Sequence, residues 1–179
     1  MSKASAALLA FSTLALAACS SVSVESEARL PQPVPAFART LVVVALPDAA
    51  RRVAEDTLVA RLASLHPSAS YPTVALENGV TLGALRERAR KEGFDGLLVV
   101  WPNGITQRDY PGLAGDTPLG IPPSTEFGLC FVASLTALDG DLEIWKGIAT
   151  NRDPFPIVRH ARETMTALAA RMRTDSLVK

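Results

Sequence analysis

Nucleophilic and proton-transferring side chains are scattered along this chain rather than grouped. The two histidines, His66 and His160, have no cysteine, serine or carboxylate at the spacing of a catalytic or metal-binding motif, so exposed surface positions are expected for both. A phosphate-binding glycine loop and a G-x-S-x-G nucleophile elbow are absent from the sequence. Asp95 precedes an apolar strand and could act as a general base, although a residue there more often hydrogen-bonds the preceding loop. The sequence therefore predicts no catalytic residue, no metal, no cofactor and no enzymatic activity.

Cys19 has the most informative surroundings of any residue in the chain. It follows Leu16-Ala17-Ala18, behind an apolar stretch over residues 6–16, and Lys3 is the only charge before Glu25. Such a stretch is too short to cross a hydrocarbon core of about 30 Å, which needs about 20 helical residues. It suits the apolar region of a secretory signal, and the small residues before the cysteine suit a signal peptidase.

This arrangement resembles the signal peptide and lipoprotein box of bacterial lipoproteins. The resemblance implies that residues 1–18 are removed and that Cys19 becomes an N-terminus carrying acyl chains such as palmitate. One acyl chain anchors a protein only reversibly, whereas several anchor it permanently. The residue after the cysteine is Ser20, whereas an aspartate there would resemble an inner-membrane retention signal. The resemblance therefore implies anchoring in the outer membrane, with the domain facing the periplasm. The alternative is an ordinary exported protein with a chance cysteine.

Charge and cysteine content limit the partners and the chemistry. The 18 basic and 18 acidic side chains balance, and removal of residues 1–18 takes away only Lys3, which leaves a net charge of about −1. A near-neutral domain lacks the basic surface that binds nucleic acid, so no nucleic-acid partner is expected. With Cys19 joined to lipid, Cys130 is the remaining thiol, and its apolar strand pattern predicts a buried, inert side chain.

The remainder of the chain divides into a tether and one domain. Residues 19–39 form the lipidated N-terminus and a tether rich in serine and proline. Alternate prolines at Pro31, Pro33 and Pro35 favour an extended polyproline II segment, which could hold the domain tens of ångströms from the bilayer. Residues 40–176 suit a single domain with its own core.

Hydrophobic periodicity predicts the elements of that domain. The helix that begins at Asp48 is expected to turn Arg51 and Glu55 away from the core. Prolines and glycines exclude regular structure over most of residues 102–124. The elements give an α/β fold of β-α-β-α-β followed by an antiparallel hairpin and a C-terminal helix, with the helices packed on a mixed sheet. The expected ranges are strands 40–46, 71–76, 97–101, 126–138 and 142–150, and helices 48–65, 81–92 and 157–174.

The order of these elements resembles a group of periplasmic lipoproteins that share the fold of the TolB N-terminal domain and of the curli-secretion lipoprotein CsgG. In that group a helix ends in glycine before a strand reading G-x-D-x-L-L-V, and residues 86–100 here read RERARKEGFDGLLVV. A hairpin of the group carries D-x-x-x-G-x-x-x-W, and residues 138–147 read LDGDLEIWKG, with a tighter turn. The resemblance covers about residues 40–173, its motifs are structural, and the stretch 102–124 has no counterpart in it.

A surface for a protein partner is the remaining candidate site. Trp101 ends a predicted strand, and Tyr110 lies beside Pro111 in the irregular stretch that follows. Aromatic residues and prolines next to an irregular loop are typical of a partner-binding patch. Trp145 is a second candidate of this kind, and completion of the core is the alternative for both tryptophans. The sequence thus predicts a non-enzymatic, membrane-anchored lipoprotein with a periplasmic protein-binding or envelope-assembly role.

Two other functions stay open. The resemblance to CsgG implies a secretion-channel component, and a pore needs membrane strands of about 9–11 residues with an apolar outer face. Only the hairpin over residues 126–150 could supply such strands, so a large ring would be required. A hydrolase of envelope polymers would need paired carboxylates at a cleft. Asp95 and Asp116 are the residues to test for that role, although their spacing does not indicate a pair.

Overall fold

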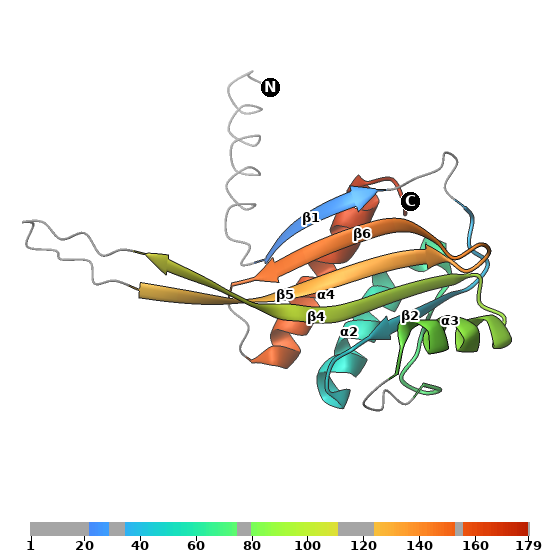
Figure 1. The fold of residues 1–179 in the computed structure, drawn as a ribbon, viewed down its shortest axis with the longest axis horizontal. Coiled ribbons are helices and arrows are strands. Elements are labelled where there is room, and N and C mark those ends of the chain that lie inside the picture. The colour runs from blue at the N-terminus through green and yellow to red at the C-terminus, as the bar shows by residue number, and fades with distance from the viewer. Residues whose placement is uncertain (1–21, 29–34, 75–79, 111–123, 153–155, 179) are drawn as a thin grey trace, which may run out of the picture.

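The computed structural model describes residues 22–28, 35–74, 80–110, 124–152 and 156–178 (Figure 1). The predicted signal peptide, residues 1–18, and Cys19 lie outside these ranges. The elements in chain order are β1 (Val22–Ala28), β2 (Thr40–Val44), α2 (Asp48–Arg61), a 3-10 turn (Ala63–Leu65), β3 (Pro67–Ala69), α3 (Leu82–Lys91), β4 (Gly96–Tyr110), β5 (Ser124–Ala137), β6 (Leu142–Asn151) and α4 (Ile157–Thr174).

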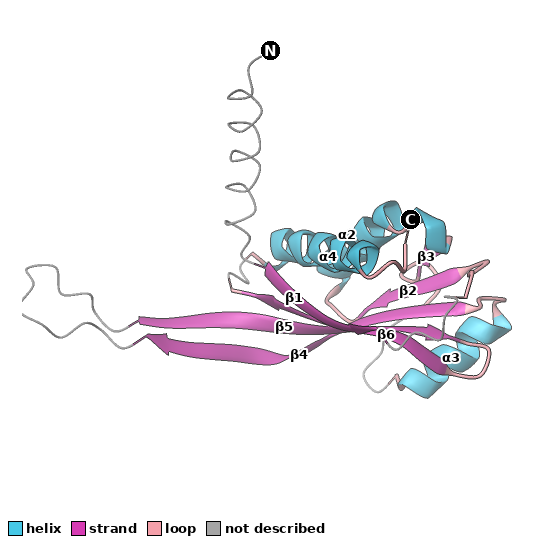
Figure 2. Ribbon diagram, turned by 90° about the horizontal axis from the view of Figure 1, so that it is seen from above, coloured by secondary structure: helices cyan, strands magenta, loops and turns pink. Residues whose placement is uncertain are grey.

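A single six-stranded sheet, in the order β1-β6-β5-β4-β2-β3, carries the helices. Strand β2 runs parallel to β3 and β4, whereas β4, β5, β6 and β1 are antiparallel neighbours, so the sheet is mixed. Helices α2 and α4 lie side by side on one face and α3 lies on the other (Figure 2). The predicted α/β fold, with its antiparallel hairpin and C-terminal helix packed on a mixed sheet, is confirmed.

The buried strands β2 and β4 supply both apolar cores. Alternate residues point to opposite faces of a strand, so Val42 and Val44 pack under α2 and α4, whereas Leu41 and Val43 pack under α3. This two-sided burial is the reason that β2 reads as a continuous apolar run. No helix in the described ranges is both long and apolar enough to cross a membrane.

Strand β4 continues well past its predicted end at residue 101. It passes through Pro102 and pairs with β5 as far as Tyr110, with a register shift between Pro102 and Ile105. Proline lacks a backbone donor and is tolerated in sheets at edges and bulges, and the shift provides such a bulge. The expectation of irregular structure over 102–124 was therefore wrong for residues 102–110, and residues 111–123 lie outside the described ranges.

The segment predicted to be a free tether contains a strand instead. β1 pairs antiparallel with β6 along its whole length, from Val22 opposite Asn151 to Ala28 opposite Trp145. The cause is apolar alternation, because Val22 and Val24 pack against the larger core while the residues between them face outward. The tether prediction over residues 19–39 is thus wrong for residues 22–28, which belong to the folded domain.

A polar cluster fastens β1 to the end of α4. The Ser26 hydroxyl donates to Asp175 Oδ2 over 2.5 Å, and Trp145 Nε1 donates to the same oxygen over 2.8 Å. Arg171 Nε lies 3.1 Å from Asp175 Oδ1 and 2.6 Å from Ser26 Oγ. Burial raises the pKa of Asp175, but the hydrogen bonds from Ser26 and Trp145 and the charge of Arg171 outweigh it and hold the pKa below its usual value.

This cluster predicts an acid-sensitive contribution to stability. A carboxylate with a lowered pKa in the folded state stabilises the fold above its unfolded pKa of about 3.9, and that stabilisation is lost as the pH falls through the folded value. Asp175→Asn should therefore unfold at lower urea concentration than the parent at pH 7, and the gap should narrow below about pH 4. Urea titrations across pH 3–7 measure the difference in unfolding midpoint between the two proteins. A difference that stays constant over this pH range would contradict the stabilising role of the Asp175 carboxylate.

Helix α2 buries a charged pair that was expected to face solvent. Glu55 is 0% exposed and Arg51 is 3% exposed. Arg51 Nε donates to Glu55 Oε1 over 2.9 Å. The backbone N–H groups of Val44, Ser70 and Tyr71 also donate to the Glu55 carboxylate, at 3.1, 2.6 and 2.9 Å. The outward placement of both residues was wrong, because this carboxylate satisfies backbone donors at the ends of β2 and β3.

Candidate functional site

The candidate catalytic residues hold structural positions. Asp95 accepts hydrogen bonds from the backbone N–H groups of Ala38 and Arg39, at 2.7 and 2.8 Å, and so fixes the loop before β2. His66 is exposed as expected, and its Nδ1 lies 2.9 Å from the carbonyl oxygen of Phe37. Asp116 lies outside the described residues.

His160 was expected on the surface, but it is buried at the start of α4. Its Nδ1 lies 3.2 Å from Glu163 Oε2, one helical turn further along α4. The residue falls on the face of α4 that carries Thr164, Leu168 and the other buried residues, which explains its burial. Within the described ranges, no three histidine, cysteine or acidic side chains gather in a metal-binding arrangement. Cys130 is a buried free thiol, as predicted.

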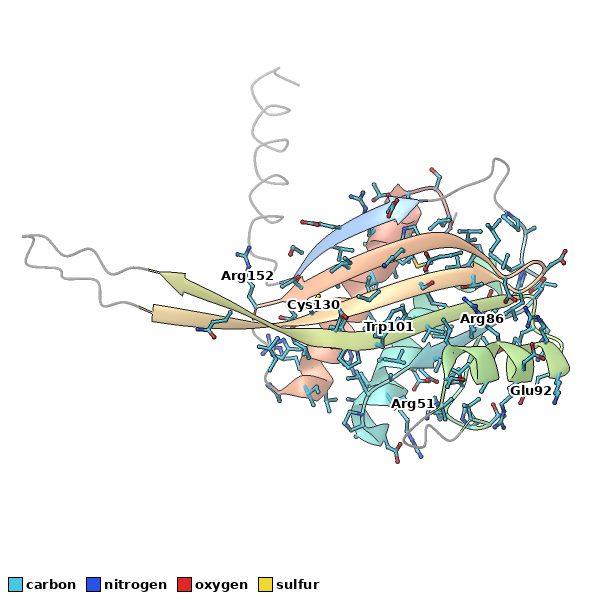
Figure 3. The ribbon with its side chains drawn as sticks, viewed as in Figure 1. Arg51, Arg86, Glu92, Trp101, Cys130 and Arg152 are labelled. Carbon is cyan, nitrogen blue, oxygen red and sulfur yellow. The ribbon has the colours of Figure 1, made fainter. Side chains whose placement is uncertain are left out.

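The aromatic candidates occupy three different environments, and Figure 3 labels one of them, Trp101 on β4. Trp145 is fully buried and hydrogen-bonded to Asp175, so it completes the core and the surface interpretation was wrong for it. Trp101 is only partly buried and lies on β4 within the body of the sheet. Tyr110 ends the same strand nine residues later, about 30 Å along it, and its side chain lies outside the described part. Trp101 and Tyr110 therefore do not form one compact patch.

An apolar groove lies beside Trp101, between the sheet and the start of α3. Its volume is about 210 Å³. The strands contribute alternate residues that point to the α3 face, and α3 is positioned by the Thr81 hydroxyl, which accepts a hydrogen bond from the Ala84 N–H over 3.2 Å. Leu82 at the mouth of the groove is 38% exposed. The full lining is Val43, Ala45, Val80, Leu82, Leu85, Val99 and Trp101.

The groove opens onto a face of the sheet that α3 does not cover. Helix α3 packs over β2 and β4, and no described helix lies over β5, β6 and β1 on this side (Figure 2). The register places Trp101, Val132, Ile148 and Glu25 side by side across the four strands β4, β5, β6 and β1. We call this surface the open face. Along this row Trp101 is partly buried, Val132 is buried and Ile148 is 39% exposed, and the exposed Glu25 stands at its outer end.

The arginines of α3 are ion-paired rather than available to a partner. Arg90 Nη2 lies 2.5 Å from Asp141 Oδ1, and Arg86 Nε lies 3.7 Å from the same oxygen. The hydrogen bond from Arg90 and the charge of Arg86 lower the pKa of Asp141, with burial opposing them. Arg90 also donates to the carbonyl of Leu138. These contacts fasten α3 to the turn between β5 and β6, which fixes the far wall of the groove.

The periodic spacing of β4 alone could have indicated part of this site. Val99 and Trp101 share a face at a spacing of two residues, so the groove wall is visible in the sequence. Val80 and Leu82 line the groove only because of the position at which α3 packs on the sheet, and the sequence pattern does not predict that position.

Comparison with known proteins gives distant structural likenesses only. No protein-family model matches the sequence, and no curated protein matches it. The PelC dodecamer from Paraburkholderia phytofirmans is 15% identical over 83% of this chain and 95% of that chain, with a TM-score of 0.47. A point variant of that dodecamer gives 12% identity, 83% and 96% coverage and a TM-score of 0.46. A PDZ domain protein from Parabacteroides distasonis gives 10% identity, 85% and 36% coverage and 0.43. All three TM-scores are below 0.5, so these likenesses assign neither family nor function.

Proposed function

We propose that this chain is a non-enzymatic lipoprotein, anchored through Cys19 to the outer membrane and facing the periplasm, which binds a protein partner through the groove beside Trp101. The signal-like residues 1–18 and the cysteine that follows them support the anchor. The groove supports the binding role, because isolated exposed apolar side chains are ordinary on a protein surface whereas clustered ones mark interaction sites.

The groove and the open face together indicate the chemistry of the partner. Val80 and Leu82 are both more than a third exposed, and the partly buried Trp101 lines the same groove. A partner segment that places an apolar side chain in the groove would bury these residues. Partly exposed tryptophan in a concave apolar setting is the type of residue on which binding energy concentrates.

Substitutions in the groove should reduce partner capture strongly. Truncating a central hot-spot side chain typically costs about 2 kcal/mol or more, so Trp101→Ala is expected to weaken binding by about 30-fold. A photo-crosslinking residue at position 82 should capture a protein in cells, and Trp101→Ala should abolish that capture. The matched control is a crosslinker at Leu142, an exposed apolar residue at the start of β6 that does not line the groove. Equal capture at positions 82 and 142, at native abundance, would contradict the proposal.

The placement of β5 and β6 favours this function over a secretion channel. The hairpin that a channel would have used lies inside the sheet, since β5 pairs with β4 and β6 pairs with β1. Side chains on both faces of β5 are buried from Phe131 to Ala137. Beyond Leu129, β5 pairs with β4 alone and forms a projecting ribbon (Figure 1). The ribbon's described residues are 105–110 and 124–128.

The hydrolase alternative has less support. Asp95 is engaged with two backbone N–H groups, which orients it toward the loop before β2. A general base needs a free lone pair directed at substrate in a cleft, and Asp95 does not line the groove.

A further inference from the structure

The position of β1 determines where an acyl anchor would meet the fold. Cys19 and Val22 are separated only by Ser20 and Ser21. Three residue steps of extended chain reach at most about 11 Å. Whatever the conformation of those residues, the first residue of β1 lies within that distance of Cys19, so a lipid on Cys19 holds the start of β1 close to the bilayer. A loose tether of the kind predicted over residues 19–39 would have left the orientation of the domain undetermined.

The strand register identifies the part of the domain that is held there. Val22 lies opposite Asn151, Asn151 opposite Leu129, and Leu129 opposite Ile105. Strand β6 ends at this level and α4 begins six residues later, so the first turns of α4 belong to the same end (Figure 1). We call this region the anchor end, and its exposed side chains include Ile105, Arg152, Val158, Arg159 and Arg162.

The composition of the anchor end fits a phospholipid surface. Ile105 is 73% exposed and Val158 is 40% exposed, although both are large apolar side chains. The first turn of α4 contains no acidic residue and carries Arg159. Its positive charge is unfavourable at the N-terminus, the positive end of the helix dipole, unless an anion is nearby. Glu163 partly neutralises Arg159 at 3.0 Å. Arginine pairs well with phosphate oxygens, and apolar side chains next to it can enter the headgroup region.

The open face of β1 fits a membrane less well. Glu25 and Glu27 project there, and carboxylates are repelled by anionic headgroups. Asp48, in the first turn of α2, adds a further negative charge near the anchor end. The positive charges there are those of Arg152, Arg159 and Arg162.

We propose that the anchor end lies against the phospholipid surface, with Arg159 and Arg162 at the headgroup phosphates and Val158 at the interface. The proposal rests on acylation of Cys19, the anchor of the proposed function. The ribbon of β4 and β5 projects from this same end, so the placement requires the strand axes to lie oblique to the bilayer, with the ribbon along the surface. The turn between β5 and β6, at the other end of β6, then lies farther from the bilayer.

The test uses the full chain, produced with its own signal, extracted, and reconstituted in phosphatidylethanolamine and phosphatidylglycerol vesicles. Intact mass and vesicle flotation report the anchor independently of orientation. A fluorophore is attached through Val158→Cys, or through Leu142→Cys as the matched control, which is 45% exposed and lies at the other end of β6. The parent, with buried Cys130, measures background labelling. Lipids carrying a nitroxide near the headgroup then quench labels that contact the bilayer.

Quenching at position 158 should be severalfold greater than at position 142. The double substitution Arg159→Glu and Arg162→Glu should reduce quenching at 158 severalfold while flotation persists, because the acyl chains still hold the protein. Equal quenching at both positions in an acylated, floating protein would overturn the orientation but leave the anchor intact. A chain that carries no acyl mass and does not float would overturn both. Circular dichroism of each labelled variant verifies that the fold is retained.

Discussion

Replacing Glu55 with alanine is expected to lower the free energy of unfolding by at least about 3–5 kcal/mol, the cost of leaving the Arg51 guanidinium as an uncompensated buried charge. It also removes the acceptor of the Val44, Ser70 and Tyr71 amides. Each buried donor left without a partner costs about 1–3 kcal/mol. Urea unfolding followed by tryptophan fluorescence measures the loss.

Two comparisons separate the charge from the backbone contacts. The control is Glu87→Ala, whose side chain is 68% exposed and pairs with Arg90 at 2.7 Å. Exposed pairs contribute about 0–1 kcal/mol, so this variant should resemble the parent. The double substitution Arg51→Met and Glu55→Leu removes both charges and should recover part of the stability lost in Glu55→Ala. It should not recover all of it, since the three amides still lack an acceptor. A Glu55→Ala protein as stable as Glu87→Ala would refute this account.

The second large effect is expected at Cys19. Cells given an alkyne-bearing palmitate analogue should label the parent chain, and Cys19→Ala should abolish the label. Each buried methylene contributes about 0.8 kcal/mol, so losing several acyl chains removes the whole of the anchoring free energy. A chain whose first 19 residues are replaced by an ordinary secretory signal ending in alanine should then be recovered in aqueous extract.

Cys130→Ala is the matched control for that experiment. Its thiol is buried in β5, so its removal should leave palmitate incorporation and membrane association unchanged. Labelling that persists in Cys19→Ala, or parent chain recovered from aqueous extract with an unmodified sulfur at position 19, would contradict the lipoprotein assignment.

Local signals in the sequence predicted much of the fold. The last helix was expected at 157–174 and α4 runs from Ile157 to Thr174. Thr81 caps α3 through Ala84, and Gly93, with a φ of 77°, ends that region in the left-handed conformation expected of a glycine after a helix. These features depend on neighbours in the sequence, so the sequence pattern is sufficient for them.

The features that sequence analysis missed depend on distant partners. β1 has alternating apolar residues, but its pairing partner β6 lies more than a hundred residues away. The short strand expected at 71–76 is instead β3 at Pro67–Ala69, because Thr40–Val42 of β2 fixes its register. Glu55 looks like a surface residue in any helical projection, and its burial follows from the backbone donors of Ser70 and Tyr71. Similarly, the groove exists only once α3 has docked beside Trp101.

If Cys19 carries the proposed acyl anchor, the attachment of β1 to the sheet has a mechanical consequence. Seven residue pairs join β1 to β6, and the Ser26–Asp175 hydrogen bond stands near the middle of the strand. A force along the strand axis loads all the backbone hydrogen bonds between β1 and β6 at once, because these bonds lie perpendicular to the force. Tension across the sheet breaks the residue pairs one after another, starting from Val22–Asn151. When separation reaches Ser26, its hydrogen bond with Arg171 must also break, which resists further separation. The pairing of β1 with β6 therefore resists a force along the strand strongly and a force across the sheet weakly.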